Sequence, residues 1–113
     1  MSTPVDLGGL DRAIAQRLPG YLVTVSARGR VRTASVEPRM EDGRVVIDGA
    51  GPGVVKDLRA NPALTLILPP ATPDGFTLLV DGDADRPDRG SGRVWVTPSD
   101  VVMHRSSGRA AIA

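Results

Sequence analysis

Hydrophobic and polar residues alternate along much of this chain, and that alternation is its clearest structural signal. In residues 76–84, for example, apolar side chains recur at every second position with polar ones between them. A two-residue period of this kind is typical of a β-strand with one buried face. Six segments show this alternation or a short apolar run bounded by turn residues: 21–27, 31–37, 44–48, 63–68, 76–84 and 93–97. Residues 98–105 fit no single pattern.

Two other segments follow a helical period. Leu10, Ile14 and Leu18 recur every four residues, which predicts an amphipathic helix over 10–18 that ends at Pro19-Gly20. We therefore expect the chain to begin with a helix before its first strand.

The second helix is shorter and follows a glycine-rich turn. Pro52 suits the first helical position, because its missing N–H would have no partner there in any case. Val54 and Leu58 then lie four residues apart on one face, and Asn61-Pro62 ends the helix. The unpaired amides at such a helix start can hold an anion.

Short strands separated by turn signals favour a small antiparallel barrel over a parallel α/β fold. We expect a mainly β protein with six strands, a short helix between the third and fourth strands, and an N-terminal helix. The elements predict one domain over residues 1–105, followed by a flexible tail over 106–113.

Composition excludes several classes of function. The 113 residues include no cysteine, which rules out disulfides, thiolate nucleophiles and zinc–thiolate sites. The net charge is +1 and the basic residues are dispersed, so we expect no nucleic-acid partner. No apolar run reaches the roughly 18 residues of a membrane helix, and the N-terminus lacks the features of a signal peptide. We expect a cytoplasmic protein that does not contact a membrane.

Two short motifs connect the chain to a known family. One is Leu58-Arg59-Ala60-Asn61-Pro62 directly before an apolar strand, and the other is Val80-Asp81-Gly82-Asp83-Ala84, a V-x-G-x-A pattern. Together with the order of elements over residues 21–84, they resemble the split-barrel flavin-binding superfamily. That superfamily includes pyridoxamine 5'-phosphate oxidase, small flavin reductases and deazaflavin-dependent reductases.

The resemblance implies a split-barrel homodimer with flavin mononucleotide (FMN) in a groove between subunits. The family holds the phosphate with basic and hydroxyl side chains on the second strand, which correspond here to Arg32, Thr33 and Ser35. The family's basic and hydroxyl residues at the helix start fall on Pro52-Gly53-Val54, whose side chains donate nothing to a phosphate. This departure favours weaker phosphate binding, or a barrel that has lost its cofactor.

Other residues are candidates for the same cofactor. The amides of Ala50, Gly51 and Gly53 can form an anion-binding nest, although glycine and proline serve an ordinary turn equally well. Lys56 follows within one helical turn and also suits a solvated position. Trp95 can stack on a planar flavin ring or simply pack in the fold.

The remaining chemistry-bearing residues give no catalytic constellation. His104, the only histidine, suits an acid–base or haem-ligand role, but also a surface position. The alternating Asp81, Asp83 and Asp85 are better explained by a solvated strand face than by a metal site. No serine lies in a nucleophile elbow. Catalytic residues therefore stay unassigned.

Flavin chemistry needs no such constellation, because the cofactor carries the hydride transfer. We therefore expect a flavin-dependent oxidoreductase that acts on a small molecule. The alternatives are a non-catalytic carrier of a flavin, deazaflavin or haem with the same fold, and a dimeric barrel without a cofactor.

Overall fold

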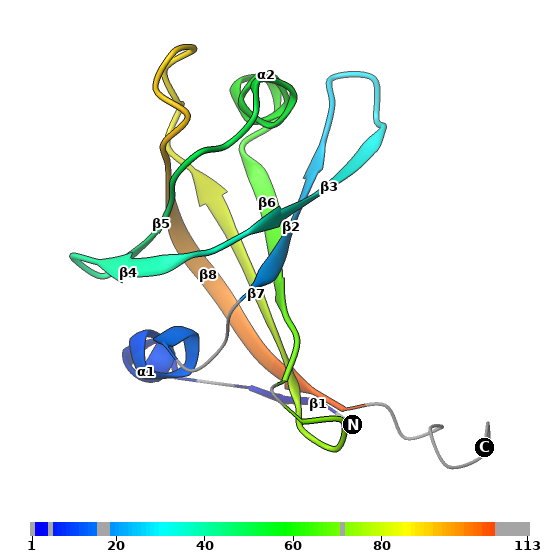
Figure 1. The fold of residues 1–113 in the computed structure, drawn as a ribbon, viewed down its shortest axis with the longest axis vertical. Coiled ribbons are helices and arrows are strands. Elements are labelled where there is room, and N and C mark those ends of the chain that lie inside the picture. Colours follow the sequence, from blue (N-terminus) through cyan, green and yellow to red (C-terminus); the bar gives the residue numbers. More distant parts are fainter. Residues whose placement is uncertain (1, 5, 16–18, 71, 106–113) are drawn as a thin grey trace.

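The fold is built on one antiparallel sheet that curls around its own apolar face (Figure 1). The computed structural model describes residues 2–4, 6–15, 19–70 and 72–105. The strands run in the order β3-β2-β6-β7-β8-β5-β4, and β1 pairs with β8. Their bounds are β1 Ser2–Pro4, β2 Gly20–Val25, β3 Val31–Val36, β4 Arg39–Glu41, β5 Arg44–Ile47, β6 Ala63–Leu68, β7 Thr77–Ala84 and β8 Val94–His104.

Helices cover the two ends of the curled sheet (Figure 1). A 3₁₀ turn, η1 (Leu7–Gly9), leads into α1 (Leu10–Ala15), which confirms the predicted N-terminal helix as far as Ala15; residues 16–18 lie outside the described part. Helix α2 (Pro52–Ala60) lies at the opposite end of the sheet. It begins at the predicted proline and ends directly before Asn61-Pro62. No helix in the described part of the chain is long and apolar enough to cross a membrane.

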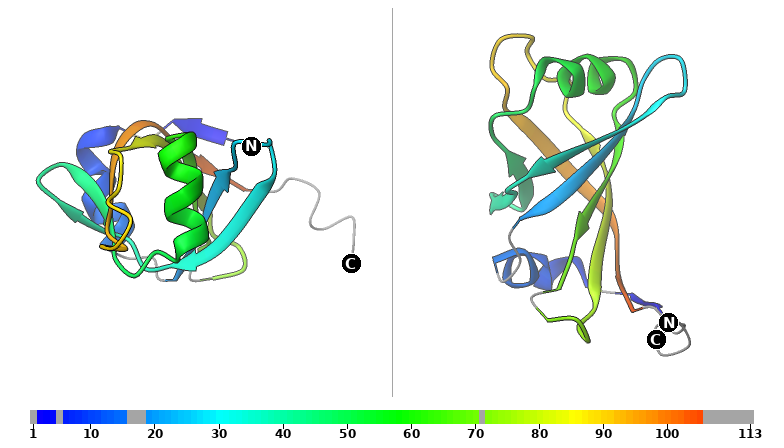
Figure 2. Two further views of the ribbon diagram at one scale, coloured as in Figure 1. Left: turned by 90° about the horizontal axis from the view of Figure 1, so that it is seen from above. Right: turned by 45° about the vertical axis from the view of Figure 1, so that its right-hand side comes forward.

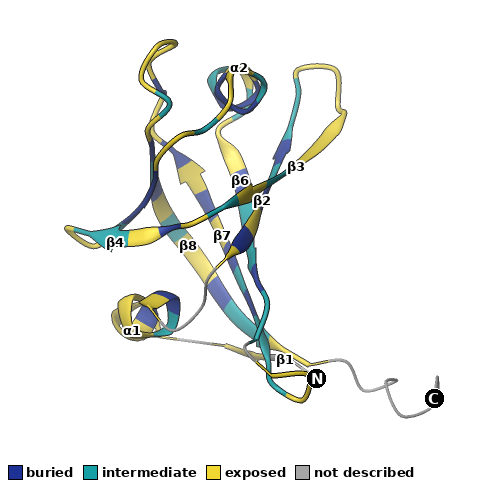
Figure 3. Cartoon of the chain, viewed as in Figure 1, coloured by how far each residue is buried: buried dark blue, intermediate teal, exposed yellow. Residues whose placement is uncertain are grey.

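The core lies between the inner face of the sheet and one face of each helix, and it is almost entirely aliphatic. The burial pattern of β7 alternates as the sequence predicts, because successive side chains of a strand point to opposite faces. The helices contribute Leu10 and Ile14 from α1, and Val54 and Leu58 from α2. In Figure 3 the buried residues of the helices and strands are dark blue, whereas most of β3 is exposed.

The prediction of six strands is wrong, because the structure has eight within its described residues. Strand β4 has three residues and β1 has three, which is too short for an alternation to be visible in the sequence. Strand β8 continues through Pro98 to His104, over the segment that fitted no pattern. Pro98 is accommodated because it pairs with Gly82 at a register shift between β7 and β8.

The register shift explains the glycine of the V-x-G-x-A motif. A Cβ on Gly82 would lie 2.6 Å from the carbonyl oxygen of Thr97 and 3.2 Å from the Cα of Pro98. Both contacts are to the backbone, which cannot move without breaking the ladder. Gly82 is therefore needed for the close approach of β7 and β8.

Candidate functional site

An arginine from the edge strand β3 reaches the first turns of α2. Arg32 lies opposite Thr24 of β2, so both side chains point to the inner face of the sheet. The Arg32 Nε donates to Asp57 Oδ2 of α2 over 2.8 Å, and the Thr24 hydroxyl donates to the same oxygen over 3.0 Å. Asp57 is 3% exposed, whereas the Arg32 side chain is 49% exposed. A buried carboxylate thus fixes a guanidinium that still faces solvent.

Gly53 provides the space in which this guanidinium lies. A Cβ on Gly53 would be 2.6 Å from both Cζ and Nη1 of Arg32 and 3.0 Å from Nη2. The position that any side chain of residue 53 would take is therefore occupied by Arg32. Val54, the next residue, is 4% exposed and belongs to the core. Gly53 and Val54, two of the three residues that depart from the family pattern, thus have structural roles of their own.

Thr33 and Ser35 lie on the other face of the sheet from Arg32. They pair with Val23 and Tyr21, whose side chains point outward. The structure therefore does not bring these two hydroxyl groups together with the guanidinium of Arg32. All three remain candidate cofactor-binding residues, but within one subunit they belong to two surfaces.

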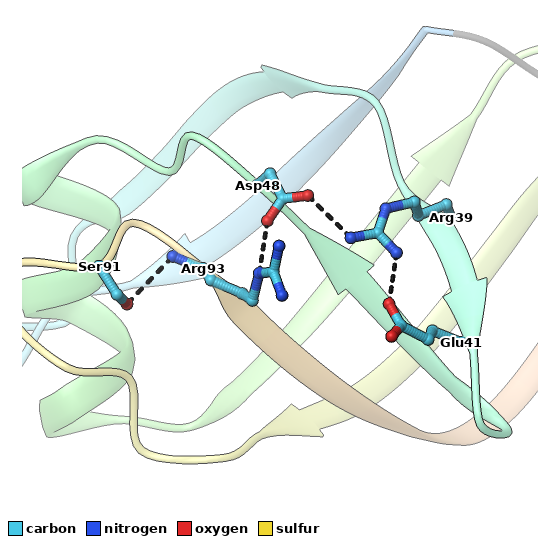
Figure 4. A network of polar contacts seen from close by, with 5 residues as sticks. All are labelled: Arg39, Glu41, Asp48, Ser91 and Arg93. Atoms are coloured by element: carbon cyan, nitrogen blue, oxygen red, sulfur yellow. Dashed lines mark hydrogen bonds and ion pairs between the residues drawn. The ribbon is translucent and has the colours of Figure 1, made fainter.

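The turn before α2 is held by a network of charged side chains (Figure 4). Asp48 accepts from Arg93 Nε over 2.7 Å and from Arg39 Nη2 over 3.0 Å, and Arg39 also contacts Glu41. The hydrogen bond from Arg93, and then that from Arg39, hold the pKa of Asp48 below its ordinary value. Since Asp48 precedes the turn, this network joins the start of the turn to β4 and to the residue before β8.

The backbone of the same turn shows which amides remain for a ligand. The Ala50 N–H donates to the Gly92 carbonyl over 2.8 Å, so the amide of Ala50 is already used. Gly51 is the N-cap of α2 and Gly53 lies in its first turn, where amides have no partner four residues earlier. Of the proposed nest, these two amides belong to the start of α2, and Gly53 is the residue that lies beside Arg32.

Lys56 and Trp95 lie away from Arg32. Lys56 lines a pocket on a different side of α2, together with Arg59. Trp95 lies on β8, which three strands separate from β3 in the sheet order. The guanidinium of Arg44 lies 4.4 Å from the centre of the Trp95 ring and covers one face of it. The structure thus places neither residue beside Arg32.

The sequence analysis missed Asp57 and Thr24. One signal was present, because Asp57 is a charged residue next to Leu58 in a helix whose inner face is otherwise apolar. A buried carboxylate needs a cationic or hydrogen-bonding partner. The partners lie 25 and 33 residues away in sequence, so only the fold reveals them.

The outer face of the sheet carries a continuous apolar row. Tyr21, Ile67, Leu79 and Val102 are successive cross-strand partners over β2, β6, β7 and β8. Tyr21 is 43% exposed, and the other three side chains are partly exposed. Single exposed apolar residues are ordinary, but a row across four strands is a contiguous patch.

Comparisons with known proteins identify relatives for this chain. The uncharacterized proteins Mb0449c of Mycobacterium bovis and MT0457 of Mycobacterium tuberculosis are each 34% identical to it over an alignment of 116 positions, which covers 91% of this chain and 82% of the relative. No protein-family model matches the chain.

Solved structures share the fold at low sequence identity. A putative pyridoxamine 5'-phosphate oxidase from Listeria innocua superposes with a TM-score of 0.68 at 14% identity, over 88% of this chain and 98% of that one. The FAD binding protein from Mycobacterium smegmatis has a TM-score of 0.68 at 15% identity, over 93% and 100%. HutZ, a heme storage protein from Vibrio cholerae, has a TM-score of 0.61 at 12% identity, over 84% and 91%. The chain therefore belongs to the family of the two mycobacterial proteins, and it shares its fold with these solved structures.

Proposed function

We propose that this protein binds a flavin-type nucleotide, with FMN as the first candidate, and that Arg32 contacts its phosphate. The observation that carries the proposal is the position of the Arg32 guanidinium over Gly53, at the first turn of α2. A cation is unfavourable at a helix N-terminus, since both carry positive charge. Asp57 offsets part of this cost, and a bound phosphate would offset more.

The donor set matches a phosphate group. Asp57 engages only Nε of Arg32, so Nη1 and Nη2 remain to donate to phosphate oxygens. The amides of Gly51 and Gly53 lie in the turn that Arg32 overhangs and can donate to the same group. This set replaces the helix-start side chains that the sequence lacks.

The proposed assembly is a homodimer with the cofactor groove between subunits. The apolar row of Tyr21, Ile67, Leu79 and Val102 is the surface that supports it. Burying apolar area stabilises an interface by roughly 25 cal/mol per Å². Thr33 and Ser35 lie on this same face, so in a dimer they would line the interface and not the Arg32 side of α2.

The proposed activity is a redox reaction on a small molecule. A bound flavin would supply the hydride or electron transfer. The residues of this chain would bind the phosphate, orient the ring and exclude water from it. We give flavin precedence over haem, because His104, the candidate haem ligand, ends β8 at the opposite end of the sheet from α2 (Figure 1).

Reconstitution tests this function. The purified chain would be titrated into FMN, FAD or a deazaflavin cofactor, and quenching of the cofactor's fluorescence would be followed. We expect saturable binding of one flavin per chain and reduction of the bound flavin by a chemical reductant. Failure to bind any of the three cofactors would contradict the proposal and support a cofactor-less barrel.

A further inference from the structure

A pocket of ≈ 500 Å³ lies on the side of α2 that faces away from β3. Figure 1 and Figure 2 show α2 between the β2–β3 hairpin on one side and the loop that joins β7 to β8 on the other. This pocket lies against that loop. Because it lies on the opposite side of α2 from β3, the pocket is separate from the Arg32 site. Its volume is in the range of sites for small organic ligands.

The pocket joins an apolar wall to a cluster of cations. The wall comes from α2, through Pro52, Val55 and Ala60. The cations come from both sides of the pocket: Lys56 and Arg59 from α2, and Arg86 and Arg89 from the loop. Among the residues that the structure describes, no acidic side chain lines the pocket.

These four cations differ from several arginines elsewhere in the chain, which pair with carboxylates. Arg32, Arg39, Arg44 and Arg93 each form an ion pair with an aspartate or a glutamate. In the described part of the chain, no ion pair involves the four pocket cations. Asp88 of the same loop acts on Arg59 only as a nearby charge.

Arg59 joins the two sides of the pocket through a hydrogen bond. Its Nη1 donates to the carbonyl oxygen of Pro87 over 2.7 Å, which ties the loop to α2, and Pro87 itself is buried. Burial lowers the pKa of Arg59, and the charges of Arg86 and Arg89 lower it further. Positive charges that repel one another in one pocket favour an anion that relieves the repulsion.

We propose that this pocket binds a small organic molecule with at least two neighbouring negative charges, the chemical class of a nucleoside diphosphate. The arginines of the loop and Lys56 hold the anionic groups from two sides, and the apolar wall of Pro52 and Val55 contacts the organic body. This site does not depend on the flavin proposal, because it shares no side chain with the Arg32 site.

The test uses adenosine diphosphate as the probe, with adenosine as the uncharged comparison, in calorimetric titrations of the full chain. We expect saturable binding of adenosine diphosphate. The affinity for adenosine should be lower by at least about tenfold. The pocket variant Arg86→Gln/Arg89→Gln should weaken binding of adenosine diphosphate by about tenfold or more. Lys56→Gln, on the opposite wall, should weaken it in the same direction.

The matched control is Arg28→Gln/Arg30→Gln, which removes the same two charges from an exposed turn that does not line the pocket. It should leave the affinity for adenosine diphosphate within about threefold of the original. Equal losses in the control and the pocket variant would overturn the proposal, since they would show only the effect of net charge. Absence of binding, or a loss in Arg32→Gln with none in the pocket variant, would overturn it as well.

Discussion

The Nε of Arg32 lies 2.8 Å from the Oδ2 of Asp57, and this ion pair joins the edge strand β3 to α2. One partner is buried and the other is half exposed, so the pair differs from an ordinary surface ion pair. The buried carboxylate needs the arginine, while the arginine keeps two nitrogen atoms for a further ligand. The same contact therefore serves stability and the proposed phosphate site.

A double-mutant cycle separates the stability part of this role. Arg32→Ala leaves the buried carboxylate of Asp57 with only the Thr24 hydroxyl, and we expect it to lower the free energy of unfolding by about 1–3 kcal/mol. Asp57→Asn in addition should restore part of that loss, because no charge is then left uncompensated. Urea unfolding of the four proteins measures the coupling. Strict additivity would show that the contact contributes nothing to stability.

Gly53→Ala tests whether the position of Arg32 matters for binding. The added methyl group would displace the guanidinium, whose Cζ would be 2.6 Å from it. We expect weaker FMN binding by about tenfold, with the fold retained. Gly51→Ala is the matched control, because a Cβ there meets nothing within 4 Å. Equal FMN affinities in the two variants would remove the role given to Gly53.

The Asp48 network predicts a pH dependence of stability. The pKa of Asp48 is lowered from its ordinary value of 3.8, first by Arg93 and then by Arg39. A lowered pKa in the folded state stabilises the fold above the unfolded-state value, and this contribution is lost as the pH falls through the folded-state value. Urea unfolding between about pH 6 and about pH 3 should show a smaller loss of stability for Asp48→Asn than for the original chain. Parallel pH profiles would contradict this account.

The apolar row on the outer face predicts the effect of a charge placed in it. Leu79→Lys should shift the protein from a dimer to a monomer of 11.8 kDa in light scattering, because a buried ammonium in an interface has no partner there. Thr97→Lys, at an exposed position of β8, is the control and should remain dimeric. If the original chain is itself a monomer at micromolar concentration, the dimer proposal is wrong.

The sequence predicted local structure well wherever a single residue type decides it. Pro52 and Asn61-Pro62 mark the ends of α2, and the alternation in β7 gave its buried face. It did not predict β4 or the passage of β8 through Pro98, because short strands and a proline in a strand depend on the neighbouring strand. Such pairings are properties of the sheet.

The candidate site was predicted in part. Arg32 became a candidate through the family resemblance, whereas the sequence analysis interpreted Gly53 as a position without a ligating side chain and as one amide of a candidate nest. The structure shows instead that Gly53 makes room for Arg32, a relation between residues 21 positions apart that no local pattern contains. Likewise, the opposite orientations of Arg32 and Thr33 follow from the strand alternation, once the pairing of β2 with β3 is known.

The central claim is that Arg32 contacts a flavin phosphate, and comparison of FMN with riboflavin tests it most directly. The two ligands share the ring and the ribityl chain, and only FMN carries the phosphate. Arg32→Gln should weaken FMN binding by about 1.5–3 kcal/mol, roughly ten- to a hundredfold, and leave riboflavin binding almost unchanged. Fluorescence titration of both ligands against both proteins gives the four affinities. An equal loss for FMN and riboflavin, or no loss for either, would contradict the assignment of Arg32.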